Sequence, residues 1–83
     1  MLAIFIVQTR IKPVKAYGKS FYDSGMKCLN QCDKRETLRL FVKSVYNDPG
    51  LADAYYQMGL LYGQEGDAAK QMALYEKAAA FPL

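Results

Sequence analysis

The sequence of 83 residues contains no histidine. Without an imidazole group the chain has neither a Ser-His nor a Cys-His nucleophile pair, and it has no His-ligated zinc site. The sequence also shows no carboxylate cluster with metal-ligand spacing and no phosphate-binding loop. We therefore expect that the protein is not an enzyme and that it has no catalytic residue, metal site or cofactor.

Cysteine is scarce, with only Cys28 and Cys32 in the chain. They stand four residues apart in a segment that we expect to be helical, where side chains share a face but rarely reach disulfide geometry without distortion. We therefore expect both thiols to be reduced and free of metal, with a metal or redox pair as the alternative. This interpretation favours a reducing intracellular compartment, such as the cytoplasm.

Long apolar runs are also missing. The run "MLAIFIV" ends at Val7 and has no basic residue before it, whereas a secretory signal needs a longer apolar region and a membrane span needs about 18 apolar residues. The composition, 52% hydrophobic and 23% charged, is typical of a soluble domain. We expect one small soluble domain without a transmembrane segment.

Charge is distributed unevenly along the chain, although the formal net charge is only +3. Nine basic and three acidic residues through Asn47 give +6, and two basic and five acidic residues from Asp48 onward give −3. This asymmetry favours an acidic partner or head-to-tail docking of a second copy. It is too weak to indicate nucleic acid by itself.

An internal repeat becomes visible when the chain is aligned with itself at an offset of 34 residues. The coincident positions pair Phe21 with Tyr55, Gly25 with Gly59, Cys28 with Tyr62, Thr37 with Gln71 and Phe41 with Tyr75. A period of this length is typical of stacked helix-pair repeats.

The repeated residues resemble the tetratricopeptide repeat. The second unit matches it with Tyr55, Met58, Gly59 and Tyr62 in its first helix and Tyr75 and Ala78 in its second, and the first unit keeps Phe21, Gly25, Phe41 and Pro49. The last helix is also similar to the Sel-one-like repeat, through Asp67, Lys70, Leu74-Tyr75 and Lys77-Ala78-Ala79. Either resemblance implies a helix-pair scaffold that binds proteins, over about residues 18–82.

Glycines explain how such helices would meet. Gly59 lies between bulky residues and leaves a gap where two helix backbones can approach closely. Gly66 can adopt a positive φ and Asp67 can cap the next helix, so the pair predicts a tight turn between antiparallel helices. We expect Asp48-Pro49-Gly50 to do the same between the two units.

These patterns predict an all-α domain of two stacked helix-turn-helix units. Its parts are an N-terminal segment at 1–17, a degenerate first repeat at 18–51 and a second repeat at 52–83. The N-terminal segment is expected to form a half-repeat helix that ends at Pro13, because Ala3, Ile4, Val7 and Ile11 share the phase of the repeat. The alternative is a short strand, since "IFIVQTRI" is rich in β-branched residues.

Aromatic and apolar residues one step round each first helix predict a concave groove for a partner. The groove set is Tyr22, Met26, Leu29, Tyr56, Leu60 and Gly63, with Lys19 and Lys27 at the rim. The alternative is that these residues are internal core, covered by the N-terminal segment or a sister chain.

The groove composition narrows the expected partner to protein. Tetratricopeptide domains that grip acidic C-termini carry Lys, Asn and Arg on this face, whereas here apolar residues occupy it, which favours an apolar or amphipathic helix or an extended peptide. We expect a scaffold or adaptor, as a homo-oligomer or as a subunit of a larger assembly that covers Met72, Tyr75 and Ala79. The alternative function is an RNA-binding helical repeat, suggested by Arg10, Lys12, Lys15 and Lys19 with Tyr17 and Tyr22.

Overall fold

The computed structural model describes residues 12–81, and the regular structure in this range is entirely α-helical. The helices are α2 (Lys15–Cys28), α3 (Lys34–Asn47), α4 (Ala52–Gln64) and α5 (Ala68–Ala79). The predicted all-α fold is confirmed. The half-repeat helix or strand expected before Pro13 falls mostly on residues 1–11, which lie outside the described residues.

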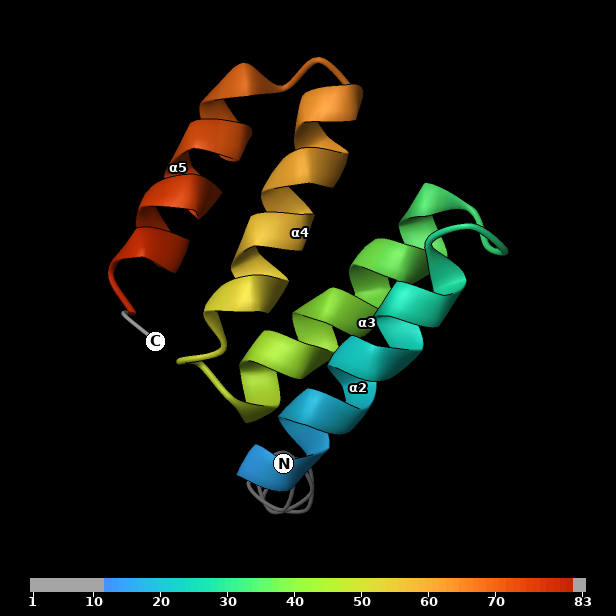
Figure 1. The fold of residues 1–83 in the computed structure, drawn as a ribbon, viewed down its shortest axis with the longest axis vertical. Coiled ribbons are helices and arrows are strands. Elements are labelled where there is room, and N and C mark those ends of the chain that lie inside the picture. Colours follow the sequence, from blue (N-terminus) through green and yellow to red (C-terminus); the bar gives the residue numbers. More distant parts are fainter. Residues whose placement is uncertain (1–11, 82–83) are drawn as a thin grey trace, which may run out of the picture.

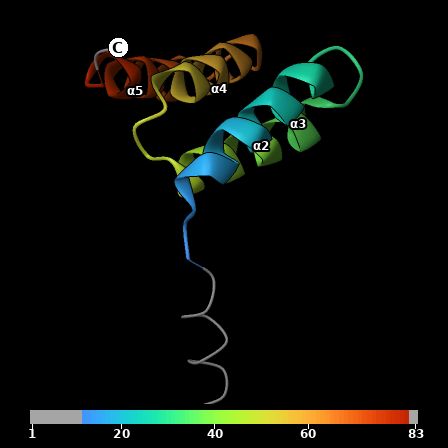
Figure 2. The ribbon, with the colours of Figure 1, turned by 60° about the horizontal axis from the view of Figure 1, so that its bottom comes forward.

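The helices form two antiparallel pairs, α2 with α3 and α4 with α5 (Figure 1). The pairs join through α3 and α4, and Figure 2 shows that the two pairs are inclined to each other rather than lying in one plane. The core lies at this junction, where Phe41 of α3 is buried with Met58 and Leu61 of α4. Fully burying a phenylalanine, methionine or leucine side chain stabilises a fold by about 1.5–3 kcal/mol.

A glycine packed against an aromatic ring holds each pair together. A Cβ added at Gly25 would lie 2.6 Å from Phe41 Cε1, and a Cβ added at Gly59 would lie 2.8 Å from Tyr75 Cε1. Neither helix pair could therefore keep its spacing with a larger residue at the glycine. Gly25 and Phe41 correspond to Gly59 and Tyr75, each 34 positions later in the chain. The sequence repeat therefore corresponds to a repeated packing contact.

The turn between α4 and α5 matches its prediction. Gly66 has a φ of 84°, in the left-handed region that glycine adopts without a steric penalty. Asp67 then caps α5, with its carboxylate accepting a 3.1 Å hydrogen bond from the Lys70 N–H. Asp33 caps α3 in the same way, accepting from the Glu36 N–H at 2.8 Å.

The Asp48-Pro49-Gly50 segment ends α3 and precedes α4, as predicted. Gly66 is the only residue with a positive φ in the described range, so this turn forms without the left-handed conformation that Gly66 adopts. The N-cap of α4 is Leu51, which has no side-chain capping bond. Asp48 instead accepts a hydrogen bond from the Gly50 N–H at 3.3 Å, and its side chain stabilises the turn rather than the start of a helix.

Two hydrogen bonds between side chains and backbone fasten α2 to α3, one buried and one exposed. Ser44 is fully buried and donates its hydroxyl to the carbonyl of Gly18 at 2.8 Å. Asn47, at the end of α3, accepts a 2.9 Å bond from the Val14 N–H just before α2. Helix α2 begins at Lys15, directly after this contact and three residues before the predicted start of the first unit.

We predict that Gly59→Leu destabilises the fold by about 1–3 kcal/mol, because the new side chain must displace the Tyr75 ring. Urea unfolding followed by circular dichroism measures this difference. Gly50→Ala is the matched control, since a Cβ at Gly50 would meet its nearest neighbours at 3.8 Å, an ordinary contact. Equal unfolding midpoints for Gly59→Leu and the control would contradict the close-packing role of Gly59.

Candidate functional site

A pocket of about 270 Å³ lies between the α2–α3 turn, the first turns of α3 and one face of α4. We call it the α4 pocket. Leucine side chains form its apolar part, and amide, ammonium and hydroxyl groups form its polar part. The apolar residues are Leu29, Leu60 and Leu61, and the polar ones are Asn30, Lys34, Thr37, Gln57 and Gln64.

Two of the six predicted groove residues line the α4 pocket. Leu29 comes from the end of α2 and Leu60 from α4, so one residue of each predicted stripe reaches the same cavity. Tyr22 and Met26 are half-buried and pack against the core cluster. The Tyr22 ring lies 5.8 Å from the Phe41 ring, centroid to centroid, and serves the junction between the helix pairs.

The last two predicted groove residues, Tyr56 and Gly63, do not line the α4 pocket either. Tyr56 is 48% exposed and stacks on Tyr75 of α5, with ring centroids 5.2 Å apart. Gly63 faces the Gln71 side chain, which would collide with a Cβ at that position. Gly63 therefore helps α4 to approach α5. Of the predicted rim residues, Lys19 pairs with Asp23 at 3.7 Å and Lys27 is exposed in the last turn of α2.

The polar part of the α4 pocket was not predicted from the sequence. Gln57 and Gln64 flank Leu60 and Leu61 at helical spacings of three and four residues, which is a signal that could have identified them. Each amide side chain offers both donors and an acceptor. Lys34 forms a 2.8 Å ion pair with Glu65 at the end of α4, so its charge is balanced beside the pocket.

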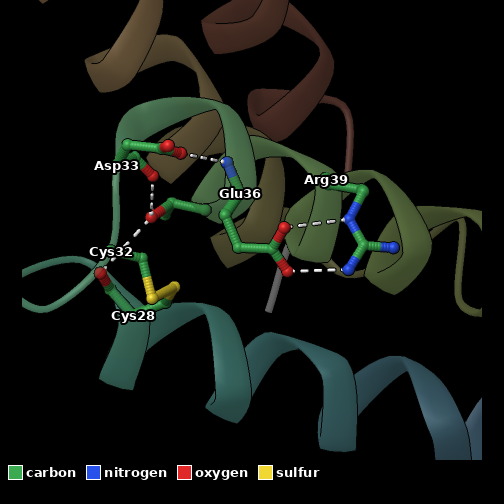
Figure 3. Close-up of a disulfide and its surroundings, with 6 residues drawn as sticks. Cys28, Cys32, Asp33, Glu36 and Arg39 are labelled. Atoms are coloured by element: carbon green, nitrogen blue, oxygen red, sulfur yellow. Dashed lines mark hydrogen bonds and ion pairs between the residues drawn. A yellow bond between two sulfur atoms is a disulfide. The ribbon is translucent and has the colours of Figure 1, made fainter.

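The structure overturns the expectation of reduced cysteines. Cys28 and Cys32 form a disulfide with a Cα–Cα distance of 4.9 Å (Figure 3). The expectation was wrong because α2 ends at Cys28, so Cys32 lies in the following turn rather than one helical turn further along the same helix. Cα atoms at this distance are within the usual range for a disulfide. The observation that favoured a reducing compartment is therefore removed.

Hydrogen bonds fix the α3 end of this turn. The hydroxyl of Thr37, which is buried, donates to the Asp33 carbonyl at 3.1 Å and lies 3.4 Å from the Cys28 carbonyl. Glu36 accepts two hydrogen bonds from Arg39, at 2.7 and 3.1 Å, on the outer side of α3 (Figure 3). These bonds lower the pKa of the Glu36 carboxyl.

Burial raises the pKa of the Tyr22 hydroxyl above its ordinary value of 10.0, and the negative charges of Asp53 and Asp23 raise it further. Each of these effects disfavours the phenolate in the folded state. The unfolded chain therefore releases this proton first as the pH rises. It follows that folding stability contributed by neutral Tyr22 is lost above about pH 10.

We predict that Tyr22→Phe reduces the loss of stability between about pH 9.5 and 11, because phenylalanine has no proton to release. Chemical unfolding of the wild type and the variant across this pH range measures the difference in slope. Tyr17→Phe is the matched control, since Tyr17 lies on the same helix but is 57% exposed. Identical pH dependence in the wild type and Tyr22→Phe would contradict the assignment.

The described residues 12–81 contain no group of three side chains suited to hold a metal ion. None of their helices is both long and apolar enough to span a bilayer. The chain matches no protein-family model, no curated protein and no solved structure. The geometry of the α4 pocket and its surroundings is therefore the basis for a functional assignment.

Proposed function

We propose that the chain is a protein-interaction module, a scaffold or adaptor, and that the α4 pocket receives an apolar side chain of its partner. The observation that carries this proposal is the convergence of Leu29 and Leu60, from the two predicted stripes, on one open cavity. The repeated helix-pair packing supports it, because such stacks commonly present a binding surface along their first helices.

The chemistry of the pocket suits a peptide segment. The three leucines offer an apolar floor, and the amides of Asn30, Gln57 and Gln64 can donate to and accept from a peptide backbone beside it. A charged group that entered the cavity would lose its hydration shell and would find no unpaired countercharge at Lys34, because Lys34 is already paired with Glu65. Lys27, at the end of α2, favours acidic residues flanking the apolar anchor.

We predict that Leu60→Lys lowers partner capture by at least about tenfold, since an ammonium group would replace apolar surface in the pocket. The measurement is quantitative mass spectrometry of proteins retained by the immobilised chain. Val42→Lys is the matched control, because Val42 is 48% exposed on α3 and does not line the pocket. Circular dichroism of both variants verifies that the helices are intact.

The decisive comparison is between the two lysine variants. A partner retained by the wild type and by Val42→Lys, but not by Leu60→Lys, supports the proposed site. A partner retained equally by all three proteins would exclude the α4 pocket as the binding site. Gln57→Lys alters a second residue of the pocket and should also lower partner capture, which shows that the loss is not specific to the Leu60 substitution.

The module is also proposed to work within a larger assembly, as a homo-oligomer or with other subunits. Helix α5 has no buried residue, and Met72 on it is exposed. Stacked helical repeats gain much of their stability from neighbouring units that cover such faces.

We predict that the purified chain associates with itself, or is stabilised by a partner subunit, through the face of α5. Light scattering coupled to size exclusion measures its mass against the 9.4 kDa of one chain. Met72→Lys should shift a self-associated form toward the monomer. A wild-type monomer that melts cooperatively at low micromolar concentration would contradict the need for a neighbouring subunit.

A further inference from the structure

The disulfide lies directly beside the α4 pocket. Cys28 ends α2 and Cys32 lies in the turn that follows, and the two residues after Cys28, Leu29 and Asn30, line the pocket. The bond therefore closes a short loop that carries one wall of the cavity. The opposite wall, with Gln57 and Leu60, belongs to α4 and is independent of this loop.

The two sulfur positions differ in their surroundings. Cys28 is only 5% exposed, and its carbonyl accepts hydrogen bonds from the Cys32 N–H at 2.8 Å and from the Gln31 N–H at 3.1 Å. Cys32 is exposed, as are its neighbours Asn30 and Gln31. The disulfide thus ties an exposed part of the turn to a buried anchor (Figure 3).

We infer that the Cys28–Cys32 disulfide is a redox latch that sets the shape of the α4 pocket. In the oxidised protein the latch holds the wall formed by Leu29 and Asn30. Reduction releases Cys32, gives the turn more conformational freedom and weakens binding in the pocket, because a mobile wall must be ordered when a partner binds. This inference rests on the proposed function of the pocket.

The exchange chemistry follows from the different exposure of the two residues. A thiolate of a dithiol reductant attacks the Sγ of Cys32, the exposed residue of the pair, the Cys28–Cys32 bond breaks, and Cys28 leaves as a thiolate that takes a proton from water. The second thiol of the reductant then attacks the mixed disulfide and releases Cys32, which is protonated in turn. Two electrons pass to the protein, which gains two thiols, and the reductant becomes a disulfide.

The location of Cys28 favours a dithiol as the reductant. A thiolate there would be buried and would lie at the C-terminal end of α2, where the helix dipole disfavours negative charge. Cys28 is therefore a poor leaving group in the first exchange step. Once its thiol has lost its proton, the Cys28 thiolate readily attacks the mixed disulfide and closes the bond again. A dithiol resolves the mixed disulfide before the bond with Cys28 can form again.

The test compares the oxidised chain with the chain reduced by dithiothreitol, with a thiol count by mass spectrometry to confirm each state. We expect reduction to speed amide hydrogen exchange at Gln31 and Cys32 by at least about tenfold, because both amides bond to the Cys28 carbonyl. The methyl signals of Leu29 and Leu60 should shift in NMR spectra, whereas those of Leu74 on α5 should not. Cys32→Ser, altered at the exposed position, should resemble the reduced protein and ignore dithiothreitol.

Partner capture separates this inference from the proposed function. Reduction should lower capture by the wild type at least about fivefold and leave capture by Cys32→Ser unchanged. Two free thiols in the chain after air oxidation, or exchange rates and leucine signals that do not respond to reduction, would overturn the latch. Capture that depends on Leu60 but is equal in both redox states would also overturn it, whereas capture that never depends on Leu60 would overturn the proposed function.

Discussion

The close approach of a glycine to an aromatic ring is the contact on which the rest of this fold depends. Phe41 covers Gly25 and Tyr75 covers Gly59, so each pair of helices is brought close by the same kind of contact. Phe41 has a second role, because its fully buried side chain also belongs to the core shared with Met58 and Leu61 of α4. The first contact therefore positions the second helix pair as well as the first. The α4 pocket lies beyond this core, in the space between the two pairs.

Hydrogen bonds of buried hydroxyl groups add to the apolar contacts between α2 and α3. Thr37 and Ser44 are both buried on α3. Ser44 donates its hydroxyl to the Gly18 carbonyl of α2, and Thr37 donates to the Asp33 carbonyl and lies 3.4 Å from the Cys28 carbonyl of α2. No buried side-chain nitrogen or oxygen in the described residues lacks a hydrogen-bond partner, so the α2–α3 interface avoids the penalty of an unsatisfied polar group. These bonds hold the two ends of the first pair in register. They leave the turn between Cys28 and Asp33 to be fixed mainly by local bonds and the disulfide.

Helical periodicity was sufficient to predict the helices, the glycine contacts and the Gly66-Asp67 turn, because each depends on residues near in sequence or on a repeated spacing. Of the predicted groove residues, Leu29 and Leu60 line the α4 pocket, whereas Tyr56 and Gly63 make contacts with α5. Those contacts depend on the rotation of α4 between its two neighbours, which a sequence pattern does not define. The disulfide was missed because α2 ends at Cys28, and a boundary shift of one turn changes the geometry of a four-residue spacing entirely.

The end of α2 at Cys28 also connects the Cys28–Cys32 disulfide with the α4 pocket. The Leu29 N–H still makes a helical hydrogen bond to the Gly25 carbonyl at 3.1 Å, although α2 ends at Cys28. The turn after it is held by the hydrogen bonds of the Gln31 and Cys32 N–H groups to the Cys28 carbonyl and by the Cys28–Cys32 disulfide. The wall of the α4 pocket that comes from α4 is stabilised by the core, whereas the wall from the turn is stabilised by a bond that a reductant can break. A cavity built in this way can change its shape without unfolding of the helices around it.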